Sequence, residues 1–173
     1  MKELKGISGE VQKLEKRVES IEKHIQQVQE RLKQIDSQLS EVKNQLVQKE
    51  TQIITLSRQL RELEHQFNET KQKIKKHRKL LQQADSPREY ERLLKDRDKL
   101  IAKATELSDR IDQLKKQLEE LMFEEDKLLE KEEELEREKE KLMREYSYLL
   151  SQLQSLVERL SRKIERAIET VSL

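Results

Sequence analysis

The 173-residue chain has no cysteine or tryptophan, and it contains only two glycines and one proline. Without cysteine it can form neither disulfides nor thiolate metal sites, which fits a reducing cytoplasm. Only 33% of its residues are hydrophobic, too few for the core of a compact globule of this length. Since 42% are charged, two classes remain, a disordered chain and a coiled coil.

Long apolar runs are also absent. No segment approaches the roughly 18–20 apolar residues that a membrane span needs, and residues 1–6 lack the apolar core of a signal peptide. The net charge of +1 predicts no gross affinity for nucleic acid or for a membrane surface. We therefore expect a soluble cytoplasmic protein with no membrane contact.

Apolar residues recur at alternating steps of three and four from Leu4 to Ala84, which makes 24 consecutive a and d positions of a heptad. Only Lys49, Thr70 and His77 are polar among them. A disordered chain has no reason to keep such a repeat, whereas a coiled-coil seam requires it. This half of the chain is predicted to be one long helix.

A second heptad starts at Tyr90, and its d positions are ten leucines spaced seven residues apart, from Leu93 to Leu156. Its a positions are mixed and include charged residues. The stretch 124–145 is rich in charge and poor in seam residues. We expect a looser, more mobile seam there, or a second chain that covers the first helix.

The heptad phase breaks at the only proline. Ser86 is predicted to cap a new helix, with Pro87 at its first position and Glu89 completing a capping box. Tyr90 is expected to form the last core layer under this turn. A short turn between two helices makes them antiparallel neighbours.

The predicted fold is therefore all-α, a long antiparallel two-helix coiled-coil hairpin that forms a single elongated domain. Arm 1 covers residues 1–85, the turn and cap 86–89, and arm 2 residues 90–173. If Ala84 faces Tyr90, the numbers of facing residues add to 174. The predicted polar layers, which would fix the register, pair Lys49 with Glu125 and His77 with Arg97.

Arm 2 carries more apolar surface than one seam requires. Further apolar residues fall at its e positions, which suits a helix with two neighbours. Near the C-terminal end the heptad is expected to slip. The apolar stripe is then expected to continue through Leu160, Ile164, Ile168 and Val171. We expect an apolar stripe in 143–171 to pack against a second copy, giving a homodimer, or against another protein. Its residues are Met143, Leu150, Val157, Ile164 and Ile168.

Charge is uneven along the chain. Residues 71–103 contain 12 Lys or Arg against 5 Asp or Glu, a net +7, whereas residues 119–145 contain 6 against 13, a net −7. The basic residues around the turn, called the basic tip, are Lys71, Lys73, Lys75, Lys76, Arg78, Lys79, Arg88 and Arg92. The alternatives for this tip are contact with a phosphate backbone, contact with an acidic protein, and a solvated face without a specific role. The lack of interleaved aromatic residues argues against sequence-specific RNA recognition.

The sequence offers no chemistry for catalysis. It has no phosphate-binding loop and no nucleophile–base pair, and a two-helix coil provides no concave, desolvated site. We expect no enzymatic activity, no cofactor, no metal and no small-molecule substrate.

The turn sequence 80–96, with Arg88, Glu89, Tyr90 and Leu93, resembles the hairpin tip of a bacterial family built from a long coiled coil and a C4-type zinc ribbon. Residues 117–125 are similar to that family's second arm. The resemblance covers roughly residues 60–130 and implies an accessory protein or chaperone of flagellar or type III secretion assembly that acts by protein contact. The zinc ribbon is absent, so the chain is either a coiled-coil fragment of such a protein or a member of a branch without the ribbon.

Three functions remain open. The first is an adaptor or chaperone-like scaffold that binds protein partners. The second is a nucleic-acid-associated protein that uses the basic tip, and the third is a purely structural spacer.

Overall fold

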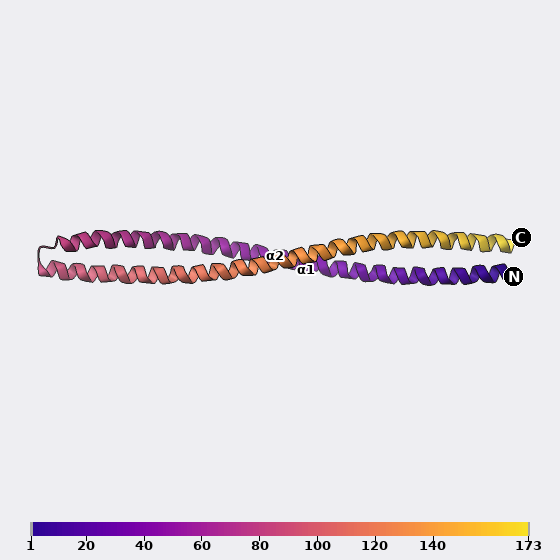
Figure 1. The fold of residues 1–173 in the computed structure, drawn as a ribbon, viewed down its shortest axis with the longest axis horizontal. Helices are drawn as coiled ribbons and strands as arrows, with labels where there is room; N and C mark the ends of the chain where they lie inside the picture. Colours follow the sequence, from indigo (N-terminus) through magenta and orange to yellow (C-terminus); the bar gives the residue numbers. More distant parts are fainter. Residues whose placement is uncertain (1, 173) are drawn as a thin grey trace. The chain divides into compact units, whose positions relative to one another are not determined.

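The computed structural model describes residues 2–172, and these form two helices and no strand. Helix α1 spans Lys2–Gln82 and helix α2 spans Pro87–Ser172. The two helices run antiparallel and pack against each other (Figure 1). The predicted all-α antiparallel hairpin is confirmed. None of the described helices contains a stretch long and apolar enough to cross a membrane.

Burial follows the predicted heptads. Every a and d position of α1 from Ile7 to Leu81 is buried or half-buried, and so are all ten d-position leucines of α2. The positions between them are mostly exposed and polar, because only the seam is removed from water when two helices pair. The predicted seams of both helices are therefore confirmed, with Leu4 left 37% exposed at the first position.

The described residues fall into two compact units, and each helix contributes one segment to each unit. Unit 1 comprises residues 2–43 and 130–172, and unit 2 comprises residues 44–129. In unit 2, Leu63, Leu107 and Ile111 form a buried cluster. In unit 1, Ile25, Val28 and Leu149 form another. The pairs Leu63 with Ile111 and Ile25 with Leu149 both add to 174, so each unit keeps the predicted register.

On the C-terminal side of the turn the predicted Ser86 cap is formed, but no bond from the Ser86 N–H to the Glu89 carboxylate, which would complete the capping box, is found among residues 2–172. The Ser86 hydroxyl accepts a hydrogen bond from the backbone N–H of Glu89 at 3.2 Å, and the backbone N–H of Tyr90 donates to the Ser86 carbonyl at 3.0 Å. The first bond satisfies one of the N–H groups that the start of a helix leaves without partners, and the second is the first regular backbone bond of α2. Ser86 thus caps α2, and Pro87 is its first residue.

On the other side of the turn, α1 ends at Gln82, earlier than the predicted end near residue 85. The N–H of Gln83 bonds to the carbonyl of Leu80 at 3.2 Å, which tightens the last helical turn. Tyr90 is 46% exposed, so its expected place in the last core layer is wrong. The reason is that its facing residue, Ala84, lies beyond the end of α1 and is too small to cover a tyrosine ring.

Candidate binding surfaces

Three lysines occupy seam positions between the helices, and each forms an ion pair with the opposite helix. Lys49 forms an ion pair with Glu124, whereas the sequence predicted Glu125 as its partner. Lys139 pairs with Asp36 at 2.8 Å, and Lys163 pairs with Glu10. Each lysine lays its aliphatic stem along the seam and carries its ammonium outward to a carboxylate beside the seam on the other helix. This outward path explains why Lys49 reaches the more exposed Glu124.

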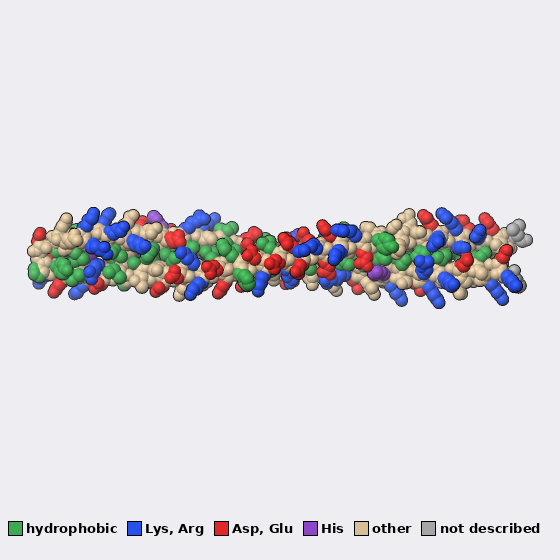
Figure 2. Space-filling model, viewed as in Figure 1, with side chains coloured by type: hydrophobic (Ala, Val, Ile, Leu, Met, Phe, Trp, Pro, Cys, Tyr) green, Lys and Arg blue, Asp and Glu red, His purple; other side chains and the backbone are tan. Residues whose placement is uncertain are grey.

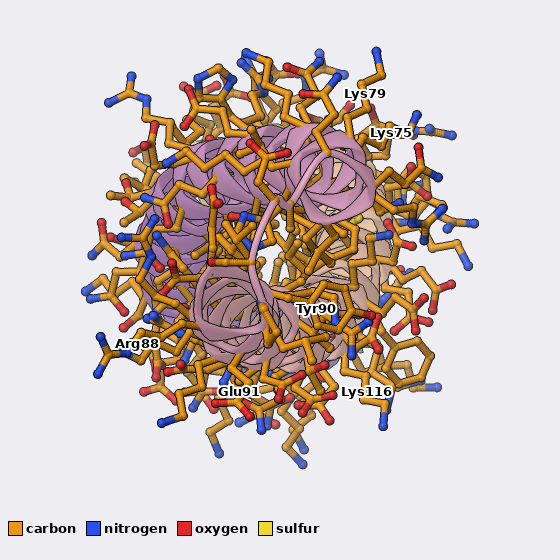
Figure 3. All side chains as sticks on the ribbon, turned by 90° about the vertical axis from the view of Figure 1, so that its left-hand side faces the viewer. Lys75, Lys79, Arg88, Tyr90, Glu91 and Lys116 are labelled. Atoms are coloured by element: carbon orange, nitrogen blue, oxygen red, sulfur yellow. The ribbon has the colours of Figure 1, made fainter. Side chains whose placement is uncertain are left out.

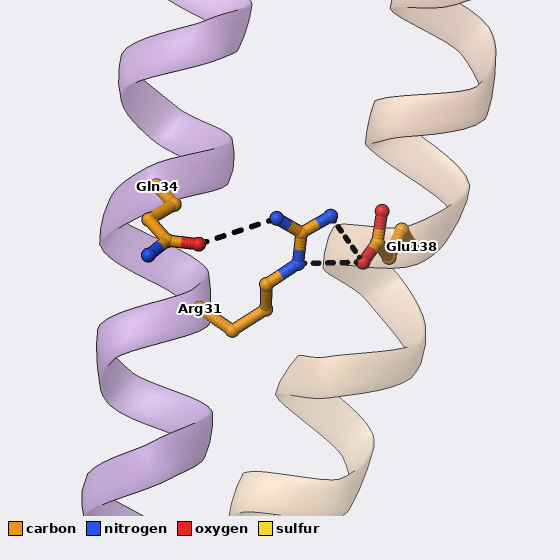
Figure 4. A network of polar contacts seen from close by, with 3 residues as sticks. All are labelled: Arg31, Gln34 and Glu138. Atoms are coloured by element: carbon orange, nitrogen blue, oxygen red, sulfur yellow. Dashed lines mark hydrogen bonds and ion pairs between the residues drawn. The ribbon is translucent and has the colours of Figure 1, made fainter.

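The α1 residues that face the charge-dense stretch 124–145 are more completely buried than expected. Ile35, which faces Lys139, is 0% exposed, and Val42, which faces Glu132, is 2% exposed. The expected loose packing of these two layers is wrong, and at Ile35 the stem of Lys139 covers the seam. Beside it, the Arg31 guanidinium donates from Nε to Oε1 of Glu138 at 2.8 Å and from Nη1 to Gln34 at 3.3 Å (Figure 4).

A polar layer lies near the turn in unit 2. His77 is only 8% exposed, and its Nε2 makes a short hydrogen bond with the backbone carbonyl of Leu93. Its predicted layer partner, Arg97, is half-buried, and the Nε of Arg97 has no hydrogen-bond partner in the part of the chain that the structure describes. Thr70 is 3% exposed and bonds back to the Gln66 carbonyl at 2.8 Å. Helix α1 therefore satisfies Thr70 internally, whereas Arg97 is left partly unsatisfied.

The basic tip remains open to solvent. All eight of its Lys and Arg side chains are exposed, and no ion pair is found for any of them among residues 2–172. Lys71 lies over the Phe67 ring with its Nζ 4.5 Å from the centroid. Lys75 and Lys79 extend from α1, and Arg88 extends from α2 in a different direction (Figure 3). Lys and Arg side chains also project near the turn on the face drawn in Figure 2. The positive charge therefore surrounds the turn and does not form one flat face.

The end of α2 departs from the predicted heptad slip. The seam continues in phase beyond Leu160 through Lys163, Ala167 and Thr170, which are all half-buried. Ile168 and Val171 are left 61% and 69% exposed. The expected heptad slip is wrong, because α2 continues without a stutter and so keeps its phase. Lys163 is a seam residue that the sequence reasoning missed, and counting on by heptads from Leu160 would have found it.

The apolar stripe stays outside the hairpin. Met143, Leu150, Val157 and Ile164 are between 41% and 53% exposed, and Ile168 and Val171 continue the line. Where the stripe passes α1, residues of both helices line a groove of about 440 Å³ that contains no charged side chain. The α1 lining of this groove consists of Leu4, Ile7, Ser8 and Val11. The helix pair alone therefore leaves a continuous uncharged surface in contact with water.

The opposite side of the same segment of unit 1 is charged. Glu10 and Lys163 lie in a groove of about 650 Å³ lined largely by Arg, Lys and Glu. The hydrogen bond from Lys163 lowers the pKa of Glu10 below its ordinary value, and the positive charges of Lys163, Arg166 and Lys13 act in the same direction.

We expect Lys163→Met to raise the pKa of Glu10, because methionine keeps much of the stem but removes both the hydrogen bond and the charge. The carbon-13 shift of the Glu10 carboxyl, followed by NMR as the pH is lowered, measures this change. Because the folded pKa is lowered, the pair's stabilisation is present above the unfolded pKa and is lost as the pH falls through the folded one. The same titration curve in both proteins would contradict the prediction.

No group of three or more potential metal-ligating side chains is found among the described residues. Comparisons of the chain with protein-family models, with curated proteins and with solved structures give no match.

Proposed function

We propose that this chain is a non-enzymatic scaffold that binds other proteins along the surface of its helical hairpin. The observation that carries the proposal is the apolar stripe, whose large side chains remain exposed although the seam of the hairpin is already filled. Contiguous apolar surface of this kind is costly in water and marks sites where another molecule binds. An adaptor or chaperone-like role follows, since the described residues offer the exposed stripe and open grooves along the two helices.

The resemblance of the turn to the coiled-coil and zinc-ribbon family supplies a setting for this scaffold. The resemblance implies a cytoplasmic accessory protein or chaperone of flagellar or type III secretion assembly that acts by protein contact. In that setting the partners of the chain are proteins of the assembly.

The basic tip supports a second candidate, a protein that binds the phosphate backbone of nucleic acid. Its side chains are exposed and surround the turn, as contact with phosphates requires. It ranks second because Tyr90 is the one exposed aromatic ring among residues 71–103, which leaves little for base stacking.

A shortened hairpin separates these functions. Deleting 74–80 and 94–100 removes one heptad from each arm, so the phase and the register are kept while half of the basic tip is lost. Immobilised intact and shortened chains are incubated with lysate of the source organism, and bound proteins and nucleic acids are identified. We expect the intact chain to retain specific proteins that are stable to nuclease. Retention of nucleic acid alone, lost from the shortened chain, would select the second candidate, and no retention would select a spacer.

A further inference from the structure

The apolar stripe belongs to a second heptad line on α2. From Met143 the line steps by four and three to Leu150, Val157, Ile164, Ile168 and Val171, with Ser147, Gln154 and Ser161 at the intervening positions. All nine positions are exposed and none is charged, in a chain that is 42% charged. Toward the turn the same line meets Glu140 and Glu136, so the uncharged part begins at Met143. Alternating steps of three and four along one helix face are the pattern that packs against another helix.

This second line lies on a defined side of unit 1. Ile164 and Val171 line the uncharged groove together with Ser8 of α1. Residues that follow Ser8 by one and two heptads, Glu15 and Glu22, lie on the same side of α1. The line is therefore bordered by α1 on one side and by the outer surface of α2 on the other.

Both borders carry exposed glutamates, and Arg144, which also lies on the outer border, pairs with Glu140 at 3.5 Å. Glu15 and Glu22 lie on the α1 side, and Glu158 and Glu165 lie beside the line on the outer side of α2. All four side chains are exposed, and none of them takes part in an ion pair among residues 2–172. We call these four residues the acidic rim. An uncharged line between two acidic borders is complementary to a helix whose apolar residues are flanked by Lys or Arg.

We propose that the second heptad line of α2 binds an amphipathic helix of a partner protein, with apolar residues at its a and d positions and basic residues beside them. The line spans 143–171, about 42 Å at 1.5 Å per residue, so the partner helix contributes about four heptads. A second copy of this chain fits poorly, because pairing two such lines brings two acidic rims together. The acidic rim also opposes an anionic lipid surface. This inference rests on the proposed function, that the chain is a protein-binding scaffold.

Two labelled 28-residue peptides test the inference on the full-length chain. Both have leucine and isoleucine at the a and d positions, and they carry either lysine or glutamate at the e and g positions. Fluorescence anisotropy should show at least tenfold tighter binding of the lysine peptide, and salt should reduce this difference because it screens the rim charges. Equal binding of both peptides, or no binding of either, would overturn the proposal.

Variants locate the binding. Leu150→Asp with Val157→Asp should weaken the lysine peptide at least tenfold, whereas the control Val47→Asp with Ile54→Asp changes two exposed apolar residues of α1 and should have no effect. Glu158→Lys with Glu165→Lys should reduce or invert the preference between the peptides. Circular dichroism of each variant checks that the helices are retained. Equal loss of binding in the control pair would contradict the assignment to this line.

Sedimentation equilibrium tests whether a second copy of the chain binds the line instead of a partner helix. The wild-type chain should remain a monomer at concentrations where the lysine peptide binds, and a dimer that Val157→Asp dissociates would overturn the proposal in favour of a second copy. A natural partner protein that tolerates the Leu150→Asp and Val157→Asp pair would refute this inference and leave the proposed scaffold function intact. A chain that retains no partner protein at all would instead refute the scaffold function.

Discussion

Replacing Ile35 with alanine should destabilise unit 1 by about 2 to 5 kcal/mol, because it opens a cavity that neighbouring side chains cannot easily fill. Ile35 is 0% exposed and faces the stem of Lys139, whose ammonium is held by Asp36 at 2.8 Å. The ion pair restrains that stem, so the lysine cannot move freely into the space. Urea unfolding followed by circular dichroism measures the loss.

The control is the same substitution elsewhere on α1. Ile54 is 53% exposed, so Ile54→Ala should change the free energy of unfolding by no more than about 0.5 kcal/mol. Similar losses in both variants would mean that Ile35 does not face α2 as the register requires.

The seam could be predicted because the sequence leaves only one apolar line on α1. Its a and d positions carry apolar residues, and nearly everything else is polar or charged, so no alternative face can be buried. The register follows from aligning Ala84 with Tyr90 once Ser86 and Pro87 fix the start of α2, although Tyr90 itself stays outside the core. The clusters around Leu63 and Ile25 lie in that register because the heptads contain no stutter between the turn and either cluster.

Details at both ends of the helices could not be predicted from hydropathy. Near the C-terminus, α2 offers two lines at heptad spacing, and the more apolar one contains Ile164, Ile168 and Val171. Helical phase decides between them, and it places Lys163 in the seam instead. At the turn, the sequence could locate the cap of α2. The end of α1 depends on two backbone hydrogen bonds between residues three apart, which no residue type requires.

The binding surfaces could be predicted only as positions. The sequence identifies the five apolar residues of the stripe and the eight basic residues of the tip. It does not show that the stripe stays exposed. That depends on which of the two apolar lines of α2 faces α1, and the helical phase of α2 determines this. The ion-pair partners also depend on side-chain reach, as the pairing of Lys49 with Glu124 demonstrates.

The double substitution His77→Leu with Arg97→Leu should stabilise unit 2 by about 1 to 3 kcal/mol, because it removes a buried donor without a partner and completes an apolar layer. His77 is 8% exposed, and the Nη2 of the partly exposed Arg97 pairs with Asp98 at 3.6 Å, but its buried Nε finds no partner among residues 2–172, so this one donor carries a desolvation cost. Two leucines would match the neighbouring layers, which contain Leu81 and Leu100. Thermal unfolding followed by circular dichroism measures the gain.

The register should survive this change, because the capped turn at Ser86 fixes which residues face each other before the polar layer is reached. Spin labels at exposed positions 72 and 103 should give the same distance in the wild type and in the double variant. Lys76→Leu with Arg92→Leu is the matched control, since both side chains are exposed and should change stability by no more than about 0.5 kcal/mol. A double variant that is less stable than the wild type would show that the His77 hydrogen bond to the Leu93 carbonyl outweighs the desolvation of the layer. A changed label distance would show that the polar layer, and not the turn, selects the register.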